Sequence, residues 1–257
     1  MENSNRVAVI MGGTSGIGLA TAKRLATDGA KVVIAGRDLE KGKRAQEVLG
    51  PDALFVRADV EQAEEVHAVV DRALSEHGRL DWAVNAAAWG RFAAAPTASV
   101  EELAWRRTMS VDLTGMWLCM RAELNAMSGS GKGGAIVNVS SVNGLSATPM
   151  ASAYCAAKHG VQGLSKTAAL EYAAANIRIN VVCPGAHRTP LLQRAFEALS
   201  PAAPERAEAM YVERIPLGRI GEPDGCAAAI AWLLSDEASY VTGAVLAVDG
   251  GLSLGAA

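Results

Sequence analysis

The stretch Val7–Gly18 reads Val-Ala-Val-Ile-Met-Gly-Gly-Thr-Ser-Gly-Ile-Gly and sets the architecture of the chain. Its first five residues are all apolar, as expected for a strand that is buried on both faces of a parallel sheet. Gly12, Gly16 and Gly18 follow, and a helical pattern covers Ile17–Thr27. Glycines permit a tight turn and let the backbone approach a phosphate at a helix N-terminus. The spacing is not the general GxGxxG, yet the strand–turn–helix context predicts a dinucleotide site.

Apolar runs alternate with helical patterns along the rest of the chain. The further expected strands are Val32–Ala35, Leu54–Arg57, Trp82–Asn85, Ala135–Ser140, Ile179–Cys183 and Val245–Val248. The further expected helices are Leu39–Leu49, Glu61–His77, much of Glu101–Met127, Ala151–Ala175 and Cys226–Leu234. This alternation predicts an α/β fold: a doubly wound, Rossmann-like parallel sheet of seven strands with helices on both faces. No long Pro/Gly/Ser linker divides the chain, so residues 1–257 are expected to form a single domain.

The segment Pro190–Pro216 interrupts the alternation of strands and helices. It contains Pro201 and Pro204 and reads as irregular. Insertions of this kind often cover a ligand site, so we expect a substrate loop or lid over about residues 190–216. The alternative is a solvated connection.

Composition excludes several function classes. The 257 residues are half apolar and carry a net charge of −3, which gives no electrostatic case for nucleic acid or an anionic membrane. No run of about 18 apolar residues predicts a membrane span. The histidines and cysteines show no HExxH or CxxC grouping, so neither a metal site nor a disulfide framework is expected. Reduced thiols favour a reducing compartment, and we expect a cytoplasmic location.

The end of the second expected strand bears on cofactor choice. An acidic residue there suits the ribose hydroxyls of NAD, whereas an arginine suits the 2′-phosphate of NADP. Gly36 stands at the acidic position and Arg37 follows, which favours NADP over NAD. Asp38 has two interpretations, as a ribose ligand or, as we favour, as the cap of the next helix. Asp59 likewise has two interpretations: it binds the adenine amino group, or it caps a helix.

Tyr154 and Lys158 are four residues apart and project from the same side of an expected helix. A phenol has a pKa of roughly 10, which makes it a poor proton shuttle near neutrality. A nearby ammonium favours the phenolate and is expected to lower that pKa towards the working range. The pair therefore fits an active site, although such pairs also occur by chance on amphipathic helices.

Several motifs in order make the chain resemble the short-chain dehydrogenase/reductase family in its single-domain form, from Val7 to about Leu252. They are Gly12-x-x-x-Gly16-x-Gly18, Asn85-Ala-Ala, Ser141, Tyr154-x-x-x-Lys158, Pro184-Gly185 and Val248-Asp249-Gly250-Gly251. The resemblance implies an NAD(P)-dependent oxidoreductase that interconverts a ketone or aldehyde and an alcohol. It also implies a homotetramer. The alternative is a non-catalytic nucleotide-binding scaffold or redox-sensing subunit.

The resemblance assigns roles to individual residues. Tyr154 is implied to be the general acid/base, Lys158 to lower its pKa and bind ribose, and Ser141 to hold the reacting oxygen. Ser140 competes with Ser141, but strand alternation directs it to the other side of the sheet. Asp112 stands where the family often has an asparagine that serves a proton relay, so its role here is open between supporting the lysine and a structural one.

The expected cofactor contacts include the adenosine side for Asn85 and the nicotinamide side for Pro184-Gly185 and Thr189. The full expected set is Gly12, Thr14, Ser15, Gly16, Ile17, Gly18, Arg37, Asp59, Val60, Asn85, Tyr154, Lys158, Pro184, Gly185 and Thr189. Candidate substrate residues, for each of which plain packing is an alternative, are Trp89, Asn143, Met150, Ala186, His187 and Leu191.

Overall fold

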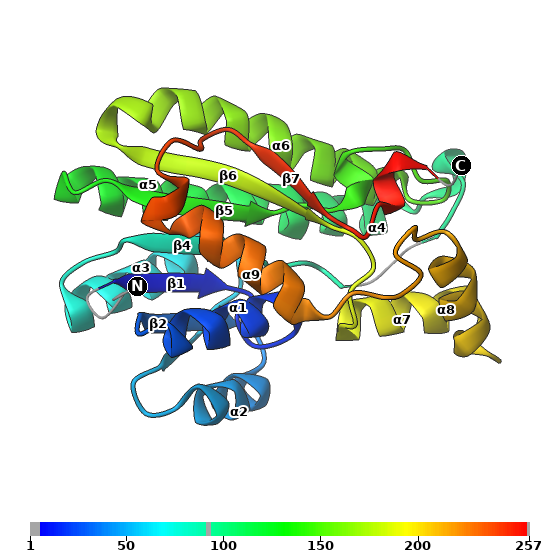
Figure 1. The fold of residues 1–257 in the computed structure, drawn as a ribbon, viewed down its shortest axis with the longest axis horizontal. Coiled ribbons are helices and arrows are strands. Elements are labelled where there is room, and N and C mark those ends of the chain that lie inside the picture. The colour runs from blue at the N-terminus through cyan, green and yellow to red at the C-terminus, as the bar shows by residue number, and fades with distance from the viewer. Residues whose placement is uncertain (1–5, 91–93, 256–257) are drawn as a thin grey trace.

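The computed structural model describes residues 6–90 and 94–255, and its seven parallel strands form one sheet in the order β3-β2-β1-β4-β5-β6-β7 (Figure 1). The strands are β1 (Val7–Met11), β2 (Lys31–Gly36), β3 (Leu54–Arg57), β4 (Trp82–Asn85), β5 (Gly134–Val139), β6 (Ile177–Pro184) and β7 (Val245–Val248). Every pairing is parallel, so the predicted doubly wound sheet is confirmed.

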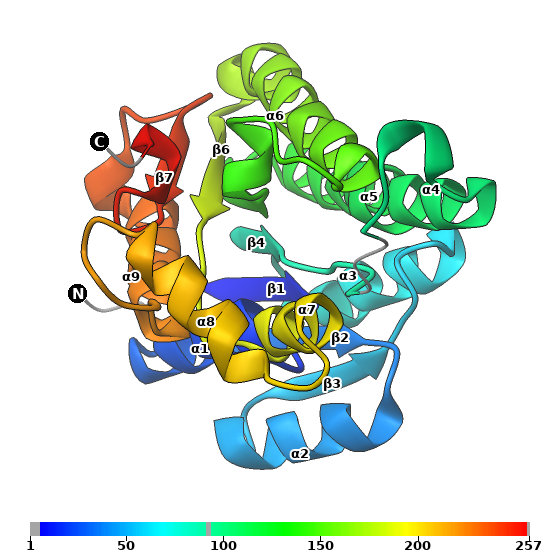
Figure 2. The ribbon, with the colours of Figure 1, turned by 90° about the vertical axis from the view of Figure 1, so that its right-hand side faces the viewer.

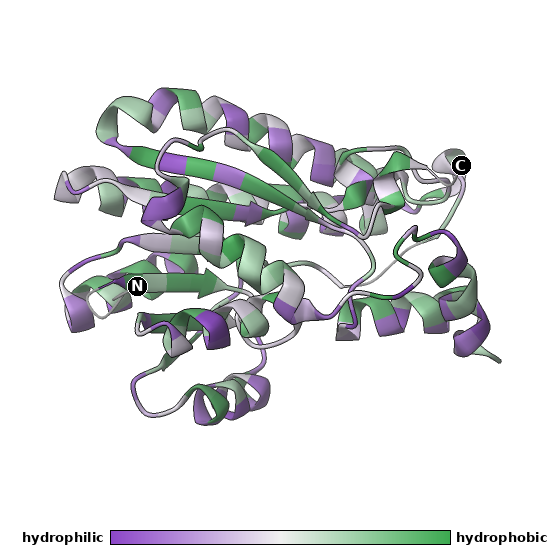
Figure 3. Ribbon diagram, in the orientation of Figure 1, coloured by the Kyte–Doolittle hydropathy of each residue, from purple (hydrophilic) through white to green (hydrophobic). Residues whose placement is uncertain are grey.

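Helices cover both faces of this sheet. They are α1 (Gly16–Thr27), α2 (Leu39–Leu49), α3 (Ala63–His77), α4 (Glu102–Met109), α5 (Gly115–Ser130), α6 (Ser152–Tyr172), α7 (Pro190–Leu199), α8 (Pro204–Glu213) and α9 (Pro223–Leu234). In β1, Val7, Val9 and Met11 join a core with α3, α5 and α6, while Ala8 and Ile10 join a core with α1, α2 and α9. Because both of its faces are buried, the central strand β1 is apolar throughout, whereas β6 carries the polar residues Arg178 and Asn180 (Figure 3).

The strand order places a crevice at one end of the sheet. The chain runs outward from β1 to β2 and β3, and then returns to place β4 on the other side of β1. Helices that follow β1 and β4 therefore leave in opposite directions, which opens a crevice at the carboxyl ends of these strands. Helices α7 and α8 lie at this same end (Figures 1 and 2).

Two sequence predictions need correction. The segment Pro190–Pro216 is largely helical, because Pro190 and Pro204 occupy first helical positions, where a missing N–H costs nothing. The single long helix expected within Glu101–Met127 is divided into α4 and α5 by a π-helical turn at Ser110–Thr114. Such turns often occur at functional sites. None of the described helices combines the length and apolar character needed to cross a membrane.

Candidate active site

A cavity of about 430 Å³ opens at the carboxyl ends of the central strands. Its walls come from the turn after β1, the segments after β2, β4, β5 and β6, the first turns of α6, and helices α7 and α8. The motifs from distant parts of the sequence thus meet in one place. The geometry of each wall limits what this cavity can hold.

The glycine turn forms one wall and leaves room for a phosphate. Gly12 has φ +79°, and a Cβ at this position would lie 2.6 Å from the backbone nitrogen of Ala87. A methyl group on Gly18 would collide with the carbonyl oxygen of Gly12. The helix α1 begins directly after Ser15, whose side chain does not cap it. Its first N–H groups therefore have no intrahelical acceptor and are available to an anion.

The wall beyond β2 carries charges of both signs, since Asp38 also lines the cavity and lies 3.6 Å from the Lys41 ammonium. Arg37 and Lys41 both line the cavity. The carboxylate of Asp38 accepts a hydrogen bond from the backbone nitrogen of Lys41 at 3.0 Å, which is the helix-cap interpretation of this residue. Asp59 does not line the cavity. It accepts from the backbone nitrogen of Glu61 at 3.1 Å and lies 3.8 Å from the Arg37 guanidinium. The cap position of α3 is Gln62, so Asp59 closes the turn before this helix and does not cap it.

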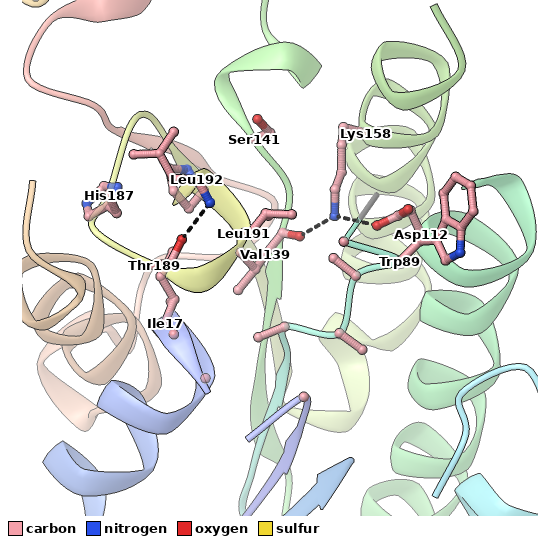
Figure 4. Close-up of a pocket in the computed structure, with 18 of the residues that line it drawn as sticks. Ile17, Trp89, Asp112, Val139, Ser141, Lys158, His187, Thr189, Leu191 and Leu192 are labelled. Atoms are coloured by element: carbon pink, nitrogen blue, oxygen red, sulfur yellow. Dashed lines mark hydrogen bonds and ion pairs between the residues drawn. The ribbon is translucent and has the colours of Figure 1, made fainter. Parts of the chain in front are cut away.

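The opposite wall carries Tyr154 and Lys158. Figure 4 shows Lys158 between Val139 and Asp112. Lys158 is only 2% exposed, and its Nζ donates to the carbonyl oxygen of Val139 at 3.1 Å. The same Nζ lies 3.7 Å from Oδ1 of Asp112, which is also 2% exposed. The ring centroid of Tyr154 is 5.6 Å from this ammonium. Asp112 therefore supports the lysine by charge, from the π-helical turn that separates α4 and α5.

The environment of Tyr154 raises the pKa of its phenol well above the ordinary value. The residue is half-buried and lines the cavity, and burial is the largest cause of the rise in its pKa. The Asp112 carboxylate raises the pKa further, while a hydrogen bond with Ser141 lowers it. The predicted net lowering by Lys158 is therefore wrong. The physical reason is first the burial of the phenol, which disfavours the phenolate, and then the charge of Asp112.

The two serines after β5 take different roles. Ser141 bonds with Tyr154, and its Oγ accepts from the backbone nitrogen of Asn143 at 3.1 Å. Ser140 instead donates to the carbonyl oxygen of Lys158 at 2.8 Å, which ties the end of β5 to α6. Ser140 therefore also points towards α6 and lines the cavity, which the strand-alternation argument did not predict; the role of Ser141 stays a prediction.

The segment after β6 lines the cavity near α7. Pro184, Gly185 and Thr189 all border it, and Thr189 also caps α7 by accepting from the backbone nitrogen of Leu192 at 3.3 Å. His187 is buried beside them, and its Nδ1 lies 3.3 Å from the carbonyl oxygen of Gly185. Burial lowers the pKa of His187, so its imidazole is neutral at pH 7.

Most predicted site residues meet in this cavity, and three do not. Those that line it are Gly12, Thr14, Ser15, Gly16, Ile17, Gly18, Arg37, Val60, Trp89, Asp112, Ser141, Asn143, Tyr154, Lys158, Pro184, Gly185, Ala186, His187, Thr189 and Leu191. The exceptions are Asp59, Asn85 and Met150. Asn85 points into the interior and is 1% exposed, so its side chain is not a cofactor ligand; Met150 is 45% exposed.

Sequence reasoning missed part of the lining. The residues it did not name include Lys41, Thr148, Leu192, Arg194, Tyr211 and Arg214. Leu192 and Arg194 lie on α7, Tyr211 lies on α8 and Arg214 directly follows α8, within the segment whose prolines predicted an irregular structure. The helical spacing of Leu192, Phe196 and Leu199 is the signal that could have found α7.

Known proteins match this chain along nearly its whole length. A family model described as enoyl-(acyl carrier protein) reductase matches residues 12–253. The chain belongs to the short-chain dehydrogenase/reductase family. It is 46% identical to the cis-4-hydroxycyclohexanecarboxylate dehydrogenase of Sinomonas cyclohexanicum over 255 residues, which are 96% of each chain. It is 41% identical to the 2,5-dichloro-2,5-cyclohexadiene-1,4-diol dehydrogenase of Sphingobium indicum over 97% of this chain and 98% of the relative.

A solved structure agrees with the sequence relatives. The crystal structure of levodione reductase has a TM-score of 0.94 with this fold at 36% identity, covering 98% of each chain. Short-chain dehydrogenases/reductases bind NAD or NADP, so the chain is an oxidoreductase of this family. The glycine turn and the open N-terminus of α1 fit the pyrophosphate of such a cofactor.

Proposed function

We propose that the chain is an NADP(H)-preferring enzyme that interconverts a secondary alcohol on a six-membered ring and the corresponding ketone. The observation that carries the proposal is the meeting of Ser141, Tyr154 and Lys158 on one wall of a cavity whose other wall is the glycine turn. Two relatives named for ring alcohols support the substrate class. Arg37 and Lys41 support the 2′-phosphate, since both line the cavity while Asp38 is engaged as a helix cap.

Side chains of the protein donate and accept the proton in the proposed reaction. The cofactor supplies or accepts the hydride when bound. In ketone reduction the phenol of Tyr154 gives its proton to the carbonyl oxygen, and Ser141 hydrogen-bonds the same oxygen as negative charge develops there. In alcohol oxidation the proton returns to Tyr154. Lys158 links α6 to β5 through the carbonyl oxygen of Val139 and to the π-helical turn through Asp112.

The first test replaces the proposed acid/base. Tyr154→Phe keeps the ring and removes the titrating oxygen, so turnover should fall by roughly 10²- to 10⁴-fold while cofactor affinity changes little. Tyr240→Phe is the control, since Tyr240 lies fully exposed at the surface. Undiminished turnover of Tyr154→Phe would refute the assignment. Tight cofactor binding without turnover across a broad panel of ring alcohols and ketones would instead favour the non-catalytic scaffold.

The cations at the α7 and α8 side of the cavity support a finer substrate class. Arg194 and Arg214 line the cavity, and in the described part of the chain neither forms an ion pair. Arg194 donates to the carbonyl oxygen of Gly90 at 3.0 Å, which ties α7 to the segment after β4. One relative is named for a ring alcohol that bears a carboxylate. We therefore propose a carboxylate on the substrate, held at this side by the two guanidinium groups.

A matched pair of substrates tests this point. The KM for 4-hydroxycyclohexanecarboxylate should rise about 10- to 100-fold in Arg214→Ala or Arg194→Ala, because a charge-assisted hydrogen bond contributes about 1.5 to 3 kcal/mol. The KM for the corresponding carboxamide should change little. Equal effects on acid and amide would contradict a charge-specific contact.

Three further predictions stand beside this function. Helices α7 and α8 act as the lid, since Leu191 and Tyr211 bring them to the cavity. The homotetramer is tested by light scattering, and the cytoplasmic location by fractionation.

A further inference from the structure

Glu123 is a carboxyl group that the proposed mechanism does not use. It lies on α5 and is 0% exposed. Its surroundings are the apolar core between the sheet and α3, α5 and α6, to which Cys119 and Met120 of the same helix belong. An ionised carboxylate in such a place is costly unless it is paired with a cation. No cation pairs with Glu123 among the described residues.

Asn85 is the partner of this carboxyl group. Its Nδ2 donates to Oε2 of Glu123 at 2.9 Å and to Oδ1 of Asn138 at 3.0 Å. Both amide hydrogens are thereby used. Two acceptor atoms of the same pair, Oε1 of Glu123 and Oδ1 of Asn85, are buried and have no hydrogen-bond donor in the described structure. Buried polar atoms are rarely left unpaired, so these two orphans call for an explanation.

A single proton explains both orphaned atoms. A neutral carboxylic acid has one O–H donor and one carbonyl acceptor, which matches the acceptor and the donor of a side-chain amide. We propose that Glu123 is a neutral carboxylic acid whose Oε1–H donates to Oδ1 of Asn85, and that this acid–amide pair makes Glu123 a positioning residue for the active site. The pair goes beyond the proposed function, because it touches neither cofactor nor substrate.

Hydrogen bonds connect the acid–amide pair to β4, β5 and α6, the elements next to the proposed catalytic residues. Asn85 ends β4, and the next residues, Ala86 to Trp89, line the cavity. Asn138 lies on β5, one residue before the carbonyl that holds Lys158. Asn138 in turn donates to Ser165 at 2.9 Å, and Ser165 lies on α6 with Tyr154 and Lys158. A loss of the acid–amide pair therefore loosens β4 and β5 beneath the cavity.

The electrostatics of the core agree with a neutral acid. Burial raises the pKa of Glu123 to about 8, against a smaller opposite effect of the Asn85 hydrogen bond. The titratable neighbour on α5 is the buried Cys119, whose pKa burial and the Glu123 charge both raise. The neighbours from β4, β5 and α6 are uncharged, and the buried side chains of α3 are Val66, Val69, Val70 and Ala73.

The sign of the pH dependence follows. The folded pKa of about 8 lies above the ordinary value of 4.5. The stability that the neutral acid contributes is therefore fully present below pH 4.5 and is lost as the pH rises through about 8. A glutamine has the same shape, donates from Nε2 and accepts at Oε1, and so reproduces the neutral acid at every pH.

The experiment compares the thermal midpoints of the full chain and of Glu123→Gln, Glu123→Leu and Glu171→Gln between pH 5 and pH 9. Glu171 is exposed on α6 and serves as the control. The midpoint of Glu123→Gln minus that of the wild type should be near zero at pH 5. It should grow to about 10 °C at pH 9 and level off above pH 8. Glu171→Gln should follow the wild type at each pH.

Turnover provides the second readout. Glu123→Gln should keep wild-type turnover at pH 7 and lose less of it than the wild type above pH 8, whereas Glu123→Leu should lose at least tenfold at every pH. Infrared difference spectra should contain the band of a protonated carboxyl group at pH 7 that Glu123→Gln lacks. A midpoint difference that does not depend on pH, or a Glu123→Gln variant as impaired as Glu123→Leu, would overturn the proposal.

Discussion

Asp112 controls the proton affinity of Tyr154, and the substitution Asp112→Asn measures by how much. The carboxylate is a cause of the raised pKa of Tyr154, after burial. Asparagine has nearly the same shape and removes the charge. It is also the residue that many family members have at this position. The variant should therefore lower the pKa of Tyr154.

The distances set the size of the effect. Oδ1 of Asp112 is 3.7 Å from Nζ of Lys158, which is 5.6 Å from the Tyr154 ring centroid, so the carboxylate lies within about 9.3 Å of the ring. Two unit charges at about 10 Å interact by roughly 1.7 kcal/mol at an effective dielectric constant of about 20. One pKa unit corresponds to about 1.4 kcal/mol. We expect the pKa of Tyr154 to fall by about one unit.

The assay is the pH dependence of kcat/KM for alcohol oxidation at saturating cofactor. The apparent pKa of the essential base should move about one unit towards acid in Asp112→Asn. Asp71→Asn, an exposed change on α3 outside the cavity, is the control and should leave the profile in place. The reasoning fails if the apparent pKa of a folded Asp112→Asn enzyme stays within 0.3 units of the wild type, or rises. A thermal scan verifies folding, because Lys158 loses a buried partner.

Two further predictions concern the cofactor wall. Arg37→Ala should reduce the ratio of NADP to NAD affinity about 10- to 100-fold, measured by cofactor titration, and an unchanged ratio would contradict the 2′-phosphate assignment. Gly18→Ala should lower the thermal midpoint by roughly 5 °C through a clash of about 2 kcal/mol with the Gly12 carbonyl, and it should weaken cofactor binding. Gly163→Ala on α6 is its control, because a Cβ there meets no atom within 4 Å; equal effects would refute the steric argument.

The sequence predicted what depends on local pattern. Each of the seven strands was found within two residues of its bounds, because a doubly wound sheet buries both faces of β1 and its neighbours and makes them continuously apolar. Tyr154 and Lys158 were found together because four residues on a helix fix their side. The serine pair after β5 is an exception: both serines follow the last strand residue and line the cavity, and Ser140 bonds to α6, so strand alternation did not separate them.

The sequence did not predict what depends on tertiary partners. Pro190 and Pro204 resemble loop signals, and only their position at helix starts shows that they are compatible with α7 and α8. The predicted direction of the Tyr154 pKa was wrong because the sequence places Lys158 beside the phenol but shows neither the burial of the phenol nor the nearby charge of Asp112. Asn85 was assigned to the cofactor because its motif lies beside the cavity, yet its side chain turns inward to Glu123.

The free-energy cost of burying a carboxyl group is offset differently at Asp112 and at Glu123. Substitutions of these two residues should therefore have different effects. Burial raises the pKa of Asp112, but the ammonium of Lys158 opposes this rise and favours the charged form, whose field reaches Tyr154, so its removal should move a titration. Glu123 pairs with no cation among the described residues and, in our proposal, takes up a proton, and this neutral form exerts no charge on the phenol. Ionisation of Glu123 removes its hydrogen bond to Oδ1 of Asn85 and so changes the positions of β4 and β5. Asp112→Asn should therefore shift the pH profile of the base, whereas Glu123→Gln should leave that pKa in place and remove an alkaline loss of stability.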